Sequence, residues 1–170
     1  MKAIVEQDHA LTQFLREHHG SLFRTALLLT GDAVDAEELL QDTLVRLFPR
    51  WHWVEEADRP VAYVRRSLTN LFISDRRRGH HRDLPLTHVS ESTDRRQPLE
   101  AVHDRSVLWP ALLALPSRQR AAIVLRYYDD LPDAEIADAL GCRPVSVRSL
   151  VSRGMSALRS ALDPTRPEVS

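Results

Sequence analysis

The chain has 170 residues, 43% of them hydrophobic and 28% charged, with a formal net charge of −1, which suits one domain or two small ones with a buried core. Cys142 is the only cysteine, which excludes a disulfide within the chain and a cluster of thiolate metal ligands and indicates a reducing, cytoplasmic setting. No apolar run reaches the length of a membrane span, so membrane insertion is not expected.

The first 60 residues place apolar side chains at the three- and four-residue spacing of helices. A stripe from Leu11 to Leu29 predicts a first helix, which ends at a Thr-Gly-Asp break. A second helix begins near Asp35, whose carboxylate suits a helix N-terminus, and stops before Pro49. Residues 51–60 contain two tryptophans and three acids and are predicted as a loop. A third helix then begins at a proline, a residue favoured in the first helical turn.

Positive charge is concentrated in residues 61–82, which contain six arginines and one acid, whereas residues 1–60 have a net charge of −5. Such a basic block indicates a surface that prefers a polyanion, and a solvated helix face is the alternative. Arginine stays charged and can bind phosphate through two hydrogen bonds, and nearby aromatic rings can stack on single-stranded bases. The candidate nucleic-acid residues here are Trp53, Tyr63, Arg65, Arg66, Asn70, Arg76, Arg77 and Arg78.

The helical pattern stops after the basic block. Residues 79–105 contain Gly79, Pro85 and Pro98 with mixed charge and too few apolar side chains to fold alone, so we predict a flexible linker. Apolar stripes resume near Ser106 and continue to about residue 162. The sequence therefore predicts an all-α fold of two small modules, a three-helix bundle and a four-helix module. Their predicted limits are residues 8–80 and 106–163, with the linker at 81–105.

The strongest local motif is a helix-turn-helix over residues 134–153. Ala137 is small enough for a close helix crossing, Gly141 can adopt the left-handed turn, and Pro144 suits the start of the next helix. Leu150 either joins the buried stripe of that second helix or faces DNA. A helix with a buried back and short polar or arginine side chains in front suits the major groove. Its candidate DNA contacts are Arg143, Ser146, Arg148, Ser149, Ser152 and Arg153.

The order of these segments resembles the extracytoplasmic-function (group IV) sigma factors of the sigma-70 family. Residues 22–32, 35–48 and 62–78 are similar to region two of that family, and residues 115–127 with the helix-turn-helix are similar to region four. The resemblance covers roughly residues 10–78 and 106–160. It implies a transcription initiation factor that binds core RNA polymerase, directs it to specific promoters and helps to melt the minus-ten element.

The resemblance also implies roles for individual residues. The helix at 35–48 would dock on the clamp helices of the polymerase β′ subunit, and its candidate contacts are Glu37, Glu38, Gln41, Asp42 and Leu44. Without the resemblance, the acids of this set would be interpreted as a solvated face. The basic helix would contact the minus-ten element. The helix-turn-helix would contact the minus-thirty-five element and its module the polymerase β flap, and an anti-sigma factor is a further expected partner.

Two other classes of protein stay open on the residues alone. A stand-alone helix-turn-helix regulator would bind duplex DNA as a dimer without polymerase, and a helical adaptor would bind protein and no DNA. Enzyme activity is not expected, because the sequence shows no metal-ligand spacing of Cys and His and no nucleophile beside a base. For the same reason no metal or cofactor is expected.

Overall fold

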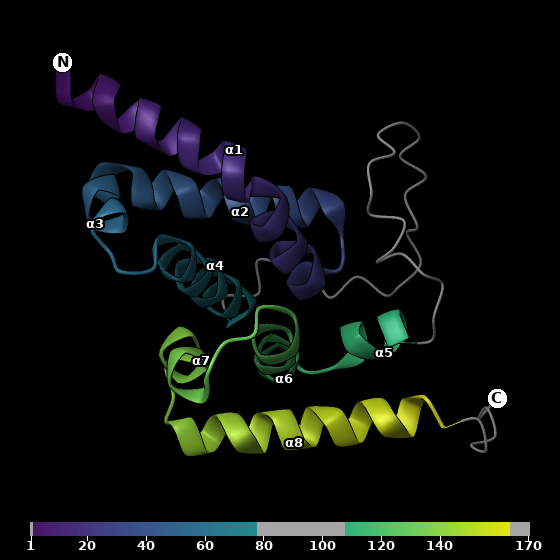
Figure 1. Cartoon of the computed structure of the whole chain (residues 1–170). Coiled ribbons are helices and arrows are strands. Elements are labelled where there is room, and N and C mark those ends of the chain that lie inside the picture. The colour runs from purple at the N-terminus through teal and green to yellow at the C-terminus, as the bar shows by residue number, and fades with distance from the viewer. Residues whose placement is uncertain (1, 78–107, 164–170) are drawn as a thin grey trace.

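The computed structural model describes the backbone of residues 2–77 and 108–163. It describes the side chains of residues 8–75 and 108–163. All regular elements in these two ranges are helices, which confirms the predicted all-α fold (Figure 1). The predicted linker at 81–105 lies outside the described residues. We refer below to the N-terminal group, helices α1 to α4, and the C-terminal group, helices α5 to α8.

The N-terminal group is built on two long helices joined by a tight turn. Helix α1 ends where Gly31 adopts a φ of +88°, a conformation that glycine reaches without strain. Asp32 then caps α2, because its carboxylate accepts hydrogen bonds from the backbone nitrogens of Val34 (2.8 Å) and Asp35 (3.1 Å). The elements of this group are α1 (Lys2–Thr30), α2 (Ala33–Leu47), the 3-10 turn η1 (Phe48–Arg50), α3 (Trp51–Glu55) and α4 (Pro60–Arg77).

The prediction of a loop over residues 51–60 is wrong for its first half, which forms helix α3. Trp51 and Val54 lie three residues apart, so one helical turn directs both side chains to the same side, where both are buried. The indole of Trp51 also contacts the ring of Phe14 edge to face, with centroids 5.1 Å apart. Burial of this apolar pair outweighs the acidic composition that favoured a loop.

The C-terminal group contains the predicted helix-turn-helix at the expected position. Gly141 has a φ of +58° and ends α7, and Pro144 begins α8. Gly154 lies where α8 crosses α6 closely, because a Cβ there would stand 2.5 Å from Cδ1 of Ile123. The elements of this group are α5 (Leu108–Ala114), α6 (Ser117–Ile123), the π-helical turn η3 (Val124–Tyr128), α7 (Asp133–Leu140) and α8 (Pro144–Ala161).

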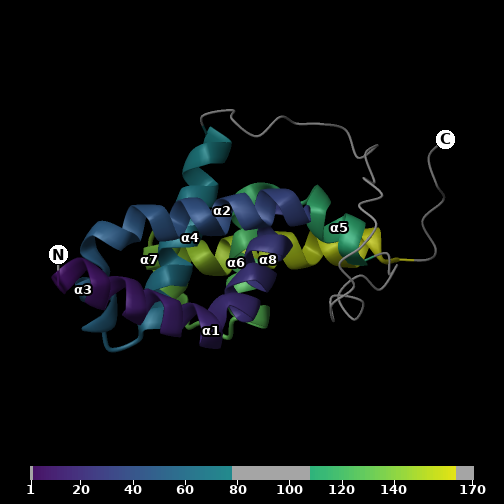
Figure 2. The ribbon, with the colours of Figure 1, turned by 90° about the horizontal axis from the view of Figure 1, so that it is seen from above.

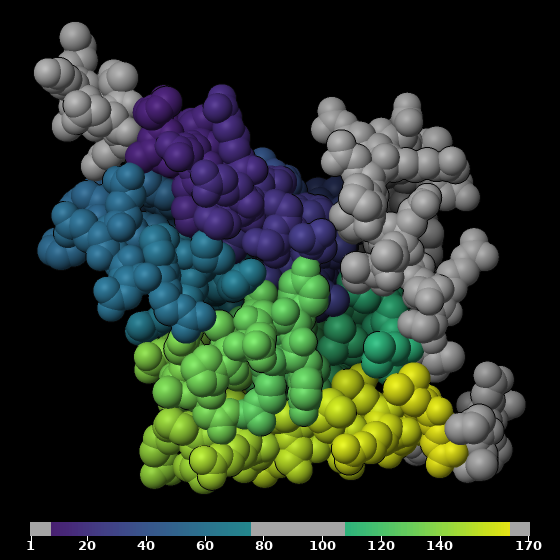
Figure 3. All heavy atoms as spheres, in the orientation of Figure 1, coloured from purple at the N-terminus to yellow at the C-terminus, as the bar shows by residue number. Residues whose placement is uncertain are grey.

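The two groups pack directly against each other, which the sequence did not predict. Figure 1 shows α4 lying over α6 and α7, with α8 running beneath them, and Figure 2 shows the same α8 passing under α6. In the space-filling view the two groups meet across the middle of the molecule (Figure 3). Leu113 occupies the space beside Gly31, where a Cβ would stand 2.7 Å from its Cδ2. This closed arrangement determines which candidate residues reach solvent.

Candidate nucleic-acid and polymerase interfaces

Two of the predicted minus-ten arginines lie on the side of α4 that faces the C-terminal group. Nε of Arg65 stands 3.0 Å from Oδ1 of Asp129, and only 18% of the Arg65 side chain is exposed. Nη1 of Arg66 lies 3.9 Å from Oδ2 of Asp138, and both of these side chains are more than half exposed. The guanidinium groups predicted to bind DNA are therefore next to carboxylates in this structure, one pair buried and the other open to water.

Asp129 lies at the junction of both groups, with its side chain fully buried. Its carboxylate accepts a hydrogen bond from the hydroxyl of Thr25 on α1, at 2.9 Å to Oδ1 and 3.2 Å to Oδ2. Burial raises the pKa of Asp129 above its ordinary value of 3.8, and the neighbouring Arg65 guanidinium and the Thr25 hydrogen bond oppose that rise. The loss of hydration therefore destabilises the charged Asp129 carboxylate more than Arg65 and Thr25 stabilise it.

A groove on another side of α4 contains two more candidates of that helix. Asn70, which is exposed, and Tyr63, which is half-buried, line a cavity of about 320 Å³ between α2 and α4. The same cavity is lined by Arg46 and Arg50, two exposed arginines that the sequence analysis missed. Their signal was available, because they are basic residues on either side of a proline in an otherwise acidic half of the chain. We call this cavity the α4 groove; it combines guanidinium groups with an amide and an aromatic ring.

Two more arginines of the basic block lie at the end of α4. The helix includes Arg76 and Arg77, whose side chains are outside the described part, and Arg78 is outside it altogether. Trp53, on α3, has 59% of its surface exposed, whereas Trp51 is buried in the core. Of these two indoles, only that of Trp53 presents a face to solvent and is available for stacking.

The second helix of the helix-turn-helix presents the expected polar surface. Leu150 is partly buried against the hydrophobic core, which decides between the two placements left open by the sequence. The side chain of Arg148 is 74% exposed, and its Nε lies 3.2 Å from Oδ2 of Asp133. All the DNA contacts predicted for this helix are exposed except Ser146, which is half-buried. We call this set the α8 face: Arg143, Ser146, Arg148, Ser149, Ser152 and Arg153.

Helix α2 displays a mixed acidic and apolar stripe. Val34 and Val45 are 73% and 71% exposed, and they lie on one helical face with Glu38 and Gln41 because the spacings are four, three and four residues. We call these four residues the α2 stripe. The two valines were missed in the sequence. Of the other candidates on α2, Asp42 is exposed, whereas Glu37 and Leu44 are half-buried.

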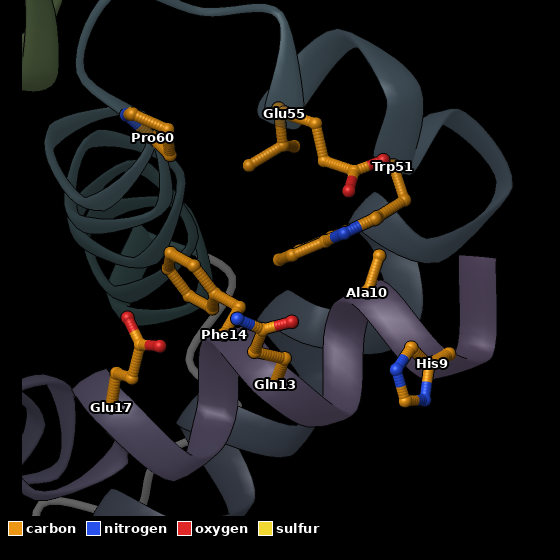
Figure 4. Close-up of a pocket in the computed structure, with 9 residues that line it drawn as sticks. His9, Ala10, Gln13, Phe14, Glu17, Trp51, Glu55 and Pro60 are labelled. Atoms are coloured by element: carbon orange, nitrogen blue, oxygen red, sulfur yellow. The ribbon is translucent and has the colours of Figure 1, made fainter. Parts of the chain in front are cut away.

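A cavity of about 630 Å³ between α1, α3 and the start of α4 contains aromatic and acidic side chains, in contrast to the arginines of the α4 groove (Figure 4). Figure 4 shows the rings of Phe14 and Trp51 within it and the carboxylates of Glu17 and Glu55 around them. Its lining contains no arginine or lysine, so this cavity is not suited to a phosphate backbone. Among the described side chains, no group of three His, Cys, Asp or Glu residues could hold a metal ion.

The fold and these surfaces define a helical protein of the helix-turn-helix class, with an exposed arginine-containing helix face and a separate acidic and apolar stripe. Residues 14–82 match sigma-70 region 2 and residues 106–158 match sigma-70 region 4. The chain is 32% identical to the RNA polymerase sigma-E factor of Streptomyces coelicolor, over 88% of this chain and 84% of that protein. It is 34% identical to the ECF RNA polymerase sigma factor SigL of Mycobacterium tuberculosis, over 86% of this chain and 85% of that protein.

Solved structures show the same arrangement. The sigma factor RpoE from Bartonella quintana, solved in complex with the anti-sigma factor NepR, superposes with a TM-score of 0.69 at 25% identity, over 92% of this chain and 99% of RpoE. CnrH in complex with the cytosolic domain of CnrY has the same fold, with a TM-score of 0.63 at 21% identity, over 97% of this chain and 95% of CnrH.

This chain belongs to the extracytoplasmic-function group of the sigma-70 family. It is a transcription initiation factor of RNA polymerase and not an enzyme, and the comparisons give no support to a stand-alone regulator. None of the helices within residues 2–77 and 108–163 has both the length and the apolar character of a membrane span.

Proposed function

We propose that three surfaces of this sigma factor divide the recognition of polymerase and promoter. The α2 stripe, with Glu37, Asp42 and Leu44 beside it, binds the β′ clamp helices of core RNA polymerase. The α4 groove and the arginines of α4 hold and help to melt the minus-ten element. The α8 face binds the minus-thirty-five element, and the C-terminal group also contacts the β flap. The working limits are residues 8–80 and 106–163, with a linker at 81–105.

The observation that supports this division is the contrast in surface chemistry. The α2 stripe has an acid and an amide between two exposed valines, which suits a protein surface and would repel phosphate. The α8 face has arginines and hydroxyls on an exposed helix with an apolar back, which suits a DNA groove. A protein that binds duplex DNA without polymerase would not need the exposed valines.

The α4 groove fits single-stranded DNA better than duplex DNA. Arg46 and Arg50 can hold phosphates, while Asn70 can hydrogen-bond a base edge and Tyr63 offers a ring. Trp53 adds an exposed indole on which an unstacked base can lie. Unstacking costs a few kcal/mol per base and stacking on an aromatic side chain returns about 1–3 kcal/mol, so capture of one or two bases can stabilise a melted promoter.

Run-off transcription with purified core polymerase and a promoter from the operon of this protein tests the proposal. The variant Glu38→Ala with Val45→Ala should lose binding to core polymerase and all promoter-specific product. The variant Arg148→Ala with Arg153→Ala should still bind core polymerase but lose product. Asp8→Asn, an exposed change on α1, is the control. Absence of promoter-specific product from the unmodified protein would refute the proposal, and tight duplex binding without polymerase would favour a stand-alone regulator.

Two further expectations belong to the same proposal. RpoE and CnrH were each solved with a regulatory partner, so we expect an anti-sigma factor for this chain as well. We expect the protein in the cytoplasm, where polymerase and promoter DNA are found. Affinity purification of the tagged chain from its host tests both, because core polymerase and a second protein that competes with it should be recovered from the soluble fraction.

A further inference from the structure

A half-buried acid lies between two arginines beside the α8 face. Asp133 is the first residue of α7, and its Oδ2 accepts a hydrogen bond from Nε of Arg148 on α8, at 3.2 Å. Its Oδ1 forms an ion pair with Nη2 of Arg126 in η3. Figure 1 shows α7 standing above the first turns of α8. One carboxylate therefore connects three successive elements of the C-terminal group, η3, α7 and α8.

Stability alone does not explain the contact between Asp133 and Arg148. The side chain of Arg148 is 74% exposed, and an ion pair so open to water contributes little net stability. Such a pair must also overcome the lost rotamer freedom of a long arginine side chain. The side chains of Arg126 and Asp133 are only 27% and 26% exposed, so theirs is the more sheltered pair. Arg126 thus fixes the carboxylate, and the carboxylate holds Arg148.

The contact restrains Arg148 without using the part of its guanidinium that is best suited to DNA. The hydrogen bond engages Nε, and a guanidinium has four further N–H bonds on its two terminal nitrogens. These terminal nitrogens can bind two acceptors of a guanine edge or of a phosphate at once, in a planar geometry. A side chain that is already held in place loses less rotamer freedom on binding, so its contact becomes tighter and depends more on geometry.

Arg126 also limits the repulsion that an acid would cause beside DNA. A lone carboxylate at the edge of a DNA-binding face would repel phosphates. Here two guanidinium groups surround one carboxylate, so the three side chains together keep a net positive charge. Asp133 can therefore hold Arg148 while the surface around it still attracts a polyanion.

We propose that Asp133 is a positioning residue for promoter recognition. Held by Arg126, it fixes Nε of Arg148, and the terminal nitrogens of Arg148 then bind one acceptor site of the minus-thirty-five element in a defined geometry. The inference rests on the proposed function in assigning the α8 face to that element. It adds a residue on α7, outside the α8 face, that acts on DNA through Arg148.

The ratio of two affinities tests this role. Holoenzyme with each variant is titrated with a duplex of the operon promoter and with a control duplex whose minus-thirty-five region is scrambled. Asp133→Ala removes the acceptor, so the ratio of promoter affinity to control affinity should fall about two- to tenfold, which is the cost of ordering one free arginine side chain on binding. Loss of a negative charge by itself would strengthen both affinities and leave their ratio unchanged.

A double-substitution cycle separates positioning from a general structural role. In a chain that already contains Arg148→Ala, Asp133→Ala should lower the affinity ratio no further, because the side chain that it positions is gone. A structural role of Asp133 at the start of α7 would instead lower the ratio equally in both backgrounds. Circular dichroism checks that all variants remain helical.

Asp133→Asn is the conservative variant, and Asp130→Asn is the matched control. The amide oxygen of Asp133→Asn can still accept from Nε of Arg148, so this variant should recover about half or more of the ratio that Asp133→Ala loses. Asp130 is exposed in the turn before α7 and has a φ of +52°, a conformation that asparagine also adopts. Asp130→Asn removes one charge from the same turn and should leave the ratio unchanged.

The contact itself is measurable in the free protein, without polymerase or DNA. In a proton–nitrogen NMR spectrum, the Nε–H signal of Arg148 is identified by its loss in Arg148→Ala. This proton should exchange with water several-fold faster in Asp133→Ala than in the unmodified protein, because its acceptor is gone, and Asp130→Asn should leave its exchange rate unchanged.

The outcomes separate the inference from the proposed function. An affinity ratio in Asp133→Ala that is unchanged or raised, an equal fall in both backgrounds of the cycle, or equal exchange rates would each overturn the positioning role. If Arg148→Ala with Arg153→Ala keeps the full ratio, the proposed function of the α8 face fails and the positioning role fails with it, whereas slow exchange would still show the contact. If that double variant is impaired while Asp133→Ala is not, only the inference fails.

Discussion

Replacement of Arg120 by methionine is the most direct test of how the two groups of helices are held together. The Arg120 side chain is 4% exposed. Its guanidinium donates to the carbonyl oxygens of Leu29, Leu113 and Leu115, the first of which lies in the other group. Methionine is similar in length and apolar, so Arg120→Met removes the donors without opening a large space.

The expected loss follows from the three acceptors. A buried carbonyl left without a donor costs about 1–3 kcal/mol, and removal of a buried charge returns part of that cost, so we expect a net loss of about 3 kcal/mol in the free energy of unfolding. For a chain of this size, that loss corresponds to a fall in Tm of about 6–12 °C.

Urea and thermal unfolding followed by circular dichroism measure this loss. Arg118→Met is the matched control, because Arg118 lies on the same helix and donates to one carbonyl within its own group, Leu140 at 2.8 Å. We expect the control to lose about 1 kcal/mol. A loss for Arg120→Met no larger than that of Arg118→Met would refute the view that this guanidinium joins the two groups.

Three further predictions concern the helix-turn-helix and the closed interface. Gly154→Ala should lower the free energy of unfolding by about 1–3 kcal/mol in a thermal denaturation, because its Cβ would meet Ile123 at 2.5 Å; unchanged stability would mean that α8 can shift freely. Arg148→Ala should reduce the slope of log K against log salt for promoter binding by the holoenzyme by about 0.9 if its guanidinium neutralises one phosphate, whereas an unchanged slope would place it away from the backbone. Burial raises the pKa of Asp129 when the two groups of helices are packed together. The packed arrangement should therefore become more stable as pH falls through that raised pKa towards 3.8, and less stable as pH rises through it. Scattering between about pH 4 and pH 7 should show this difference between the unmodified protein and Asp129→Asn, and identical pH profiles would contradict it.

Most helices could be predicted because their signals are local. The predicted start at Asp133 and the predicted starts at Pro60 and Pro144 agree with α7, α4 and α8, since a proline or an acid in the first turn acts through the backbone of the same segment. Gly141 was predicted in a left-handed turn for the same reason, and its φ is +58°. The helix-turn-helix and the polar face of α8 followed from spacing alone.

Helix α3 shows where local evidence misled. Its acids and its position between two helices favoured a loop, and the two buried side chains that stabilise it were known only as isolated apolar residues. The placement of Leu150 was undecidable for a similar reason, because its position on α8 borders both faces and only the packed core shows it to be partly buried.

The sequence by itself determined the all-α class, the basic block, the helix-turn-helix and the resemblance to sigma factors, because each depends on residues within one short segment. Only the tertiary structure decided that Arg65 is paired with Asp129, that Arg46 and Arg50 share a groove with Asn70, and that α4 lies against α7. The physical reason is that charge pairing and burial depend on distances in space between segments far apart in the chain, and neither periodicity nor composition specifies those distances.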